Sequence, residues 1–138
     1  MSKKIIAFLI LFVSNYSYST DFYWVGGTGN WDDTLSWSAT TGGLSIGNFL
    51  PTNVDNVIFD NNSGLASAAS IVTMNIPVVV NDFDYSLAPN IFTFSSVLAS
   101  IEIQGSFSCN GLANFTWLGD IRMNSTIEMI TTIASNWL

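Results

Sequence analysis

The sequence predicts an all-β fold: a right-handed parallel β-solenoid (β-helix) behind a Trp/Gly-rich N-terminal cap. Three observations carry this prediction. Only 9% of residues are charged, and the polar surface comes mainly from Asn, Ser and Thr, a mixture that favours strands and turns over helices. Apolar and polar residues alternate over short stretches, as strands with one buried face require. The alternating stretches also recur about every 20 residues, which indicates stacked repeats.

Residues 1–19 have the organisation of a secretory signal peptide. Lys3 and Lys4 form a basic start, residues 5–13 are apolar, and residues 17–19 (Ser-Tyr-Ser) offer a small-x-small cleavage site. A membrane-spanning helix needs about 20 apolar residues, and this run is much shorter. We therefore expect cleavage near Ser19, a secreted protein, and no membrane span after cleavage.

The charge balance of the processed chain argues against anionic partners. Without the leader, Arg122 is the only basic residue against ten acidic ones. Phosphate backbones and anionic lipid surfaces are bound through clustered Lys and Arg. Nucleic acid is therefore excluded as a partner, and an anionic membrane surface is a poor one.

A 20-residue offset aligns successive apolar positions in the second half of the chain. Ile101 and Ile103 alternate with Glu102 and Gln104, as in a strand, and stretches such as residues 86–90 (SLAPN) and 108–111 (SCNG) have turn composition. Each such unit can bury its inner face only against the next one. The predicted alignments are 101/121, 103/123, 107/127, 83/103, 87/107, 82/102, 98/118, 97/117, 92/112 and 58/78.

We assign residues 61–138 to solenoid coils of about 20 residues each. The same register stacks Asp82, Glu102 and Arg122 in one column, with Glu102 beside Arg122. The chain stops in mid-pattern at "ITTIASNWL", which predicts a truncated gene product or the leading piece of a longer surface protein.

Two other folds compete with the solenoid. The pattern L-x-x-I-x-I at residues 98–103 fits the start of a leucine-rich repeat, but the following "FSCNGLANFTW" has a Gly and two Asn where a helix or 3₁₀ turn is needed. Short strands at regular spacing also suit a β-sandwich, which is the alternative fold class.

Residues 20–60 carry a different pattern, "YWVGGTGNWDD…LSWS…GG…LPTNVDNVIFD". It resembles an N-terminal module of large secreted bacterial surface proteins, in which a W-V-G-G-x-G-x-W segment and a P-x-x-x-D-x-V-x-F-D segment precede a β-helix. The resemblance implies an adhesin-like protein on the outer surface of a Gram-negative bacterium, often exported by the type IX route. No C-terminal sorting domain of that route appears in the sequence.

We interpret this segment as a structural cap, because a solenoid end would otherwise expose its core and unpaired strand edges. The tryptophans supply apolar cover, the glycines permit turns with positive φ, and Asp55 suits the turn before the next strand. The predicted cap residues are Trp24, Gly26, Gly27, Gly29, Trp31, Trp37, Pro51, Asp55 and Phe59; Ser38, Val57 and Asp60 also fall on motif positions.

No catalytic constellation is predicted. Residues 26–30 (GGTGN) lack the Lys-Ser/Thr of a phosphate loop, and Cys109 is interpreted as a core residue because the chain has no His to activate it. The acidic pairs that a glycosidase would need are Asp32/Asp33, Asp55/Asp60 and Asp82/Asp84, the last on one face of a strand.

We predict no cofactor. Calcium is the metal to test, at residues 60–64 (DNNSG) and 82–84. The predicted function is a secreted or cell-surface adhesin-type scaffold without catalysis, whose partner is an extracellular surface or glycan. The alternative is a carbohydrate-binding or polysaccharide-degrading β-helix protein.

Overall fold

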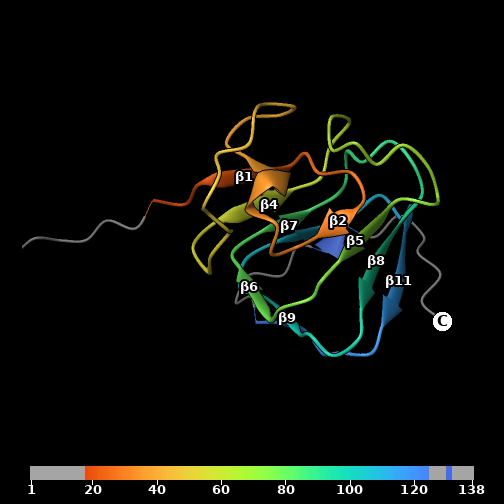
Figure 1. The fold of residues 1–138 in the computed structure, drawn as a ribbon. Coiled ribbons are helices and arrows are strands. Elements are labelled where there is room, and N and C mark those ends of the chain that lie inside the picture. Colours follow the sequence, from red (N-terminus) through yellow and green to blue (C-terminus); the bar gives the residue numbers. More distant parts are fainter. Residues whose placement is uncertain (1–17, 125–129, 132–138) are drawn as a thin grey trace, which may run out of the picture.

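The computed structural model describes residues 18–124 and 130–131, and this part of the chain is all-β (Figure 1). Its only helical element is one 3₁₀ turn, and no helix in it is long and apolar enough to cross a membrane. The elements are β1 (Asp21–Trp24), β2 (Gly29–Asn30), η1 (Thr34–Ser36), β3 (Trp37–Ser38), β4 (Asn56–Ile58), β5 (Ile71–Thr73), β6 (Val78–Val80), β7 (Phe83–Asp84), β8 (Phe92–Ser96), β9 (Ile101–Ile103), β10 (Phe107–Ser108), β11 (Ala113–Trp117), β12 (Ile121–Met123) and β13 (Ile130–Thr131).

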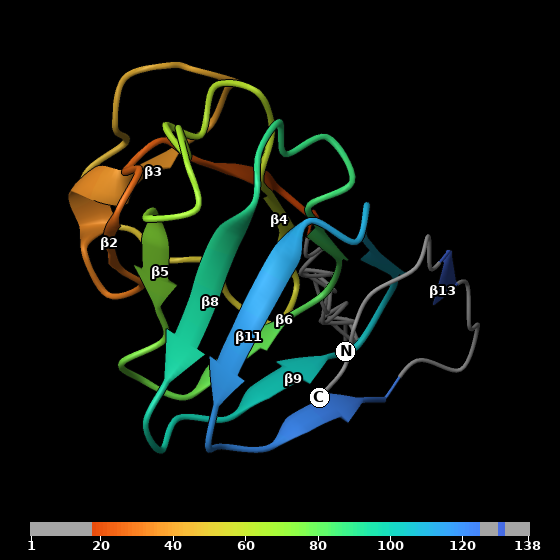
Figure 2. The ribbon, with the colours of Figure 1, turned by 90° about the vertical axis from the view of Figure 1, so that its right-hand side faces the viewer.

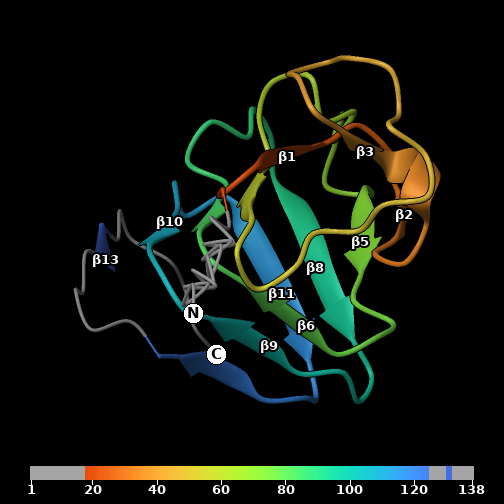
Figure 3. The same cartoon turned by 90° about the vertical axis from the view of Figure 1, so that its left-hand side faces the viewer.

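The strands form three open sheets, and from β4 onward successive strands enter them in a fixed cyclic order. Sheet A has the order β13-β10-β7-β4-β1-β3, sheet B has β11-β8-β5-β2, and sheet C has β12-β9-β6. We call one visit to sheets A, B and C a round. Figure 2 shows β5, β8 and β11 of sheet B side by side, with β9 of sheet C apart from them, and Figure 3 shows the same strands from the opposite side.

Pairing within the sheets is parallel wherever one round meets the next. β4 pairs with β7, β5 with β8 and β6 with β9, and the same holds one round later. The antiparallel exception among the named strands is β1 with β3, at the N-terminal edge of sheet A.

The alternation read from the sequence fills a common interior. In β8, Phe92 and Phe94 are buried and Thr93 between them is partly exposed. Phe83 of sheet A lies 5.3 Å from Phe94 of sheet B, ring centre to ring centre, and both line one interior gap with Ile103 of sheet C. The inward side chains of all three sheets therefore share one core.

The 20-residue register is confirmed only between β9 and β12. Ile101 pairs with Ile121, and Ile103 with Met123. The alignments 87/107 and 107/127 are wrong, because the turns between strands differ in length: Phe107 pairs with Phe83 and Ile130. The alignment 98/118 stays a prediction. The alignments 83/103, 82/102, 97/117, 92/112 and 58/78 are also wrong; Ile103 pairs with Val80, Glu102 with Val79, Trp117 with Ser96, Ala113 with Phe92 and Ile58 with Asp84.

The predicted acidic and basic column is half right. Glu102 and Arg122 are neighbours in the sheet, but Asp82 is not in their column. The Arg122 guanidinium pairs with Asp120 at 2.7 Å, and both side chains are largely exposed. Arg122 is therefore held within its own round, and an exposed pair of this kind stabilises little, about 0 to 1 kcal/mol.

The predicted turn at residues 86–90 is confirmed, whereas the helix of a leucine-rich repeat is not found. The stretch "FSCNGLANFTW" contains β10 and β11. Residues 61–138 as a run of coils, and the boundaries of the leader and the cap, stay predictions.

Parallel register between rounds can be tested by cross-linking. A Thr93→Cys/Asn114→Cys variant, made with Cys109→Ala, is expected to form an intramolecular disulfide on mild oxidation. The two positions pair directly on β8 and β11, and neighbouring strands lie about 4.8 Å apart, within the Cα range of about 4.4 to 6.8 Å for a disulfide. Mass spectrometry after thiol alkylation measures the cross-link.

The matched control is Thr93→Cys/Thr116→Cys in the same background. Thr116 lies on β11, like Asn114, but it pairs with Ser95, which puts it about 8 Å from Thr93. Equal cross-linking in the two variants, or cross-linking only in the control, would contradict this register.

Candidate functional site

The three tryptophans of the N-terminal segment pack on one another inside the protein. Trp24 and Trp37 are 0% exposed and Trp31 is 1% exposed. The Trp37 ring centre lies 5.0 Å from that of Trp24 and 4.6 Å from that of Trp31, both close to perpendicular, which is a favourable aromatic geometry. These side chains are therefore core, and they offer no exposed platform on which a ligand could stack.

Hydrogen bonds and Phe59 complete this aromatic cluster. The Trp24 indole N–H donates to the carbonyl oxygen of Gly27 at 2.9 Å, and that of Trp37 donates to the carbonyl of Trp31 at 3.0 Å. Phe59, at 0% exposure, has its ring centre within 6.4 Å of all three indoles. Since β2 and β3 are edge strands, the cluster lies at the N-terminal edge of sheets A and B.

The three predicted glycines differ in whether their positions require glycine. Gly27 has φ +60° and faces the backbone of Gly64, so a Cβ there would meet the Gly64 carbonyl oxygen at 3.0 Å. Gly26 does not have positive φ, but a Cβ on it would lie 2.6 Å from Cβ of Ser36. Gly29 has neither constraint. The prediction of positive φ is right for Gly27 and wrong for Gly26 and Gly29.

Pro51 and Asp55 organise the turn before β4. Pro51 is buried, and Asp55 is only 7% exposed. One Asp55 carboxylate oxygen accepts the Thr52 N–H and hydroxyl at 2.9 and 2.6 Å, and the other accepts the Thr20 N–H at 3.3 Å. The predicted turn role of Asp55 is confirmed, and this carboxylate also reaches the start of β1.

The candidate carboxylate pairs are bound largely to protein donors. Asp33 accepts the Leu35 N–H and caps the 3₁₀ turn. Asp60 is 7% exposed and accepts the Thr41 hydroxyl and the Asn62 N–H. Asp82 and Asp84 flank buried Phe83, and each accepts a backbone N–H, from Ser106 and Ser86 respectively.

One face of sheet A carries an open groove of about 380 Å³. Tyr23, Ile58 and Asp84 lie next to one another in the register of β1, β4 and β7. All three are partly exposed, because they alternate with the buried residues of these strands. The remaining lining residues are Thr41, Asp60, Asn61, Asn62 and Leu87. The groove thus combines an apolar strip with carboxylate, amide and hydroxyl groups.

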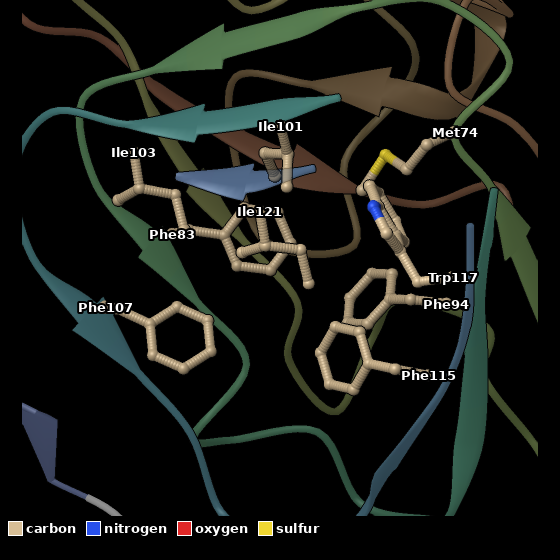
Figure 4. Close-up of a pocket in the computed structure, with 9 residues that line it drawn as sticks. All are labelled: Met74, Phe83, Phe94, Ile101, Ile103, Phe107, Phe115, Trp117 and Ile121. Atoms are coloured by element: carbon tan, nitrogen blue, oxygen red, sulfur yellow. The ribbon is translucent and has the colours of Figure 1, made fainter. Parts of the chain in front are cut away.

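A second, apolar pocket is a packing gap in the core. Figure 4 shows its lining, in which Phe94, Phe115 and Trp117 lie along one side, opposite Phe107. Its volume is about 10 Å³, no more than one water-sized probe occupies. It cannot hold a ligand as it stands.

The buried Cys109 faces Tyr85. Burial, and then the neighbouring Cys109 thiol, raise the pKa of Tyr85 far above its ordinary value, so the phenol stays neutral. Cys109 is buried, as its predicted core role requires.

Calcium binding at residues 60–64 and 82–84 stays a prediction. Residues 18–124 and 130–131 contain no group of three or more His, Cys, Asp or Glu side chains placed to hold a metal ion. Asp60 and Asp84 do line one groove, which was not predicted. Ile58 pairs with Asp84, and this spacing is longer than the 20-residue period assumed from the sequence. The assumed period therefore did not place Asp60 and Asp84 near each other.

No family model, curated protein or solved structure matches this chain.

Gly26→Ala and Gly29→Ala form a matched test of the close packing around Trp24. Gly26→Ala should lower the free energy of unfolding by about 1 to 3 kcal/mol, because the new methyl group must displace Ser36. Gly29→Ala should change it by about 0.5 kcal/mol or less, since its Cβ would meet nothing closer than 3.5 Å. Urea unfolding followed by Trp fluorescence measures both, and equal losses would contradict the packing described.

Proposed function

We propose that the protein is an exported surface scaffold, built as a right-handed parallel β-solenoid with a Trp/Gly-rich N-terminal cap and without catalysis. The observation that supports it most is the cyclic entry of β4 to β12 into three parallel sheets. A solenoid produces this order naturally, because each coil adds one strand to every sheet and contacts only its neighbours.

The pairing pattern favours the solenoid over a β-sandwich. Sandwiches of the immunoglobulin type are built from antiparallel sheets. Here nine of the ten strand pairings of the described residues are parallel, and the antiparallel one joins β1 to β3 at the N-terminal edge. This edge is where a cap would interrupt the stacking, and the buried tryptophans lie there.

A scaffold role fits the way the acidic groups are used. Asp33, Asp55, Asp60, Asp82 and Asp84 each accept hydrogen bonds that hold turns or join neighbouring strands. A glycosidase needs two carboxylates facing one substrate bond, one of them able to give a proton. Carboxylates that accept hydrogen bonds within turns favour a structural role for these residues over acid–base catalysis.

The groove on sheet A supports a second candidate function, the binding of neutral glycans. An aromatic ring beside carboxylate and amide groups is suited to a sugar, which has apolar ring faces and many hydroxyls. Tyr23 with Ile58 supplies the apolar strip, and Asp84, Asn61 and Asn62 supply polar groups. Acidic polysaccharides are disfavoured, because the lining holds two Asp and no basic residue.

Export can be tested on the chain with its own leader. Produced in a Gram-negative host, the protein is expected outside the cytoplasm and shortened to begin near Thr20, as measured by cell fractionation and mass spectrometry. Lys3→Glu/Lys4→Glu should reduce export, because the basic start is part of the signal; Asp32→Asn/Asp33→Asn serves as a control that alters charge outside the leader. Unprocessed protein retained in the cytoplasm would contradict the proposal.

Glycan binding can be tested with immobilised neutral and uronate-containing oligosaccharides. If the groove binds sugars, the processed protein should retain neutral ones, and Tyr23→Ala should weaken binding about three- to tenfold, the loss expected for one aromatic contact. Val79→Ala, an exposed position on sheet C, should bind like the parent. Binding unchanged by Tyr23→Ala, or no binding at all, would rule out this site.

A further inference from the structure

Asp55 is a buried carboxylate beside the residue that export would leave first in the chain. Its carboxylate oxygen lies 3.3 Å from the backbone nitrogen of Thr20. The Thr20 carbonyl in turn accepts the Asn56 N–H at 2.9 Å. Thr20 is thus fixed through both its backbone groups at the point where β1 begins.

This carboxylate has no cationic partner in the described residues. After the leader, Arg122 is the only basic side chain in the sequence, and it pairs with Asp120. Asp55 is 7% exposed and is held by the N–H groups of Thr20 and Thr52 and by the Thr52 hydroxyl. A buried charge is costly unless it is paired and hydrogen-bonded. Here hydrogen bonds alone offset the cost of burying the Asp55 carboxylate.

We propose that Asp55 binds the α-ammonium group of Thr20 in the processed protein, so that removal of the signal peptide completes an ion pair between β1 and the turn before β4. This inference rests on the proposed export and on cleavage after Ser19. While Ser19 is attached, the Thr20 nitrogen is a neutral amide with one N–H. Once Thr20 is first, the same nitrogen carries a positive charge and three N–H donors, and its bond to the carboxylate becomes charge-assisted.

Two other carboxylates lie near this point. Asp21 is exposed and accepts the Asn56 side-chain amide at 2.8 Å, and Asp82 accepts the Ser106 N–H at 2.6 Å. Both have donors of their own, whereas Asp55 is the one bonded to the Thr20 nitrogen. Asp21→Asn therefore serves as a matched control that removes an equal charge at the residue next to Thr20.

The test compares three forms of the processed chain: one beginning at Thr20, one beginning at Ser19, and one beginning at N-acetylated Thr20. At pH 6.5 the free Thr20 form should have the highest Tm, by about 4 °C over the acetylated form, a shift of the size one charge-assisted bond produces in a domain of this size. The Ser19 form should resemble the acetylated one, because its charge is displaced by one residue.

The pH dependence has a defined sign. An α-amino group ordinarily loses its proton at about pH 7.7 to 8.0, and a neighbouring carboxylate favours the charged form. The extra stability of the Thr20 form should therefore be complete below about pH 7 and vanish by about pH 10, as the proton is lost from the folded state. Asp55→Asn should abolish the difference between free and acetylated Thr20 at pH 6.5, and Asp21→Asn should leave most of it.

Equal melting of the free and acetylated Thr20 forms at pH 6.5 would overturn the ion pair, and this comparison needs no side-chain variant to fold. Sequencing the N-terminus of the exported protein independently tests the second part of the proposal, cleavage after Ser19. Cleavage at a different residue would overturn the link to maturation even if the Thr20 form proves more stable. Failure of the ion pair, in turn, would leave the export proposal standing.

Discussion

The strands that the structure describes depend on the strands that pair with them in each sheet. The strands are short, so each offers the core only a few inward side chains. Isolated pairs of such strands are not stable in water. Stability comes from parallel pairing that brings like side chains together, as with Phe94 of β8 on Phe115 of β11, whose ring centres lie 5.4 Å apart.

The N-terminal edge of the described sheets differs from the parallel pairing elsewhere in them. At the N-terminal edge, the last strand of sheet A is the antiparallel β3 and the last strand of sheet B is the short β2. The aromatic cluster of Trp24, Trp31 and Trp37 lies at this edge. Short and antiparallel edges are poor templates for further parallel strands. These two edges and the buried aromatic cluster therefore support the N-terminal cap proposed above.

The alternation of buried and exposed positions could be predicted from the sequence, whereas the register of the paired strands could not. The inward faces of residues 101–103, the burial of the tryptophans and the turn at Asp55 follow from local pattern. Register depends on turn length, which varies along the chain: Val57 pairs with Phe83, whereas Ile101 pairs with Ile121, a shorter spacing. The groove was not predicted for the same reason, since the longer spacing is what brings Asp60 and Asp84 to one groove.

The scarcity of charged residues also follows from stacking. In a parallel stack, equivalent positions recur about every 4.8 Å, so like charges would repel at each step. Asparagine avoids this, because its amide both donates and accepts. Asn81 donates to Asn56, which donates to Asp21, and Asn90 and Asn110 each donate to a backbone carbonyl of the preceding round, those of Leu65 and Ala88. The neutral polar composition that predicted an all-β fold therefore forms side-chain hydrogen bonds from one round to the next.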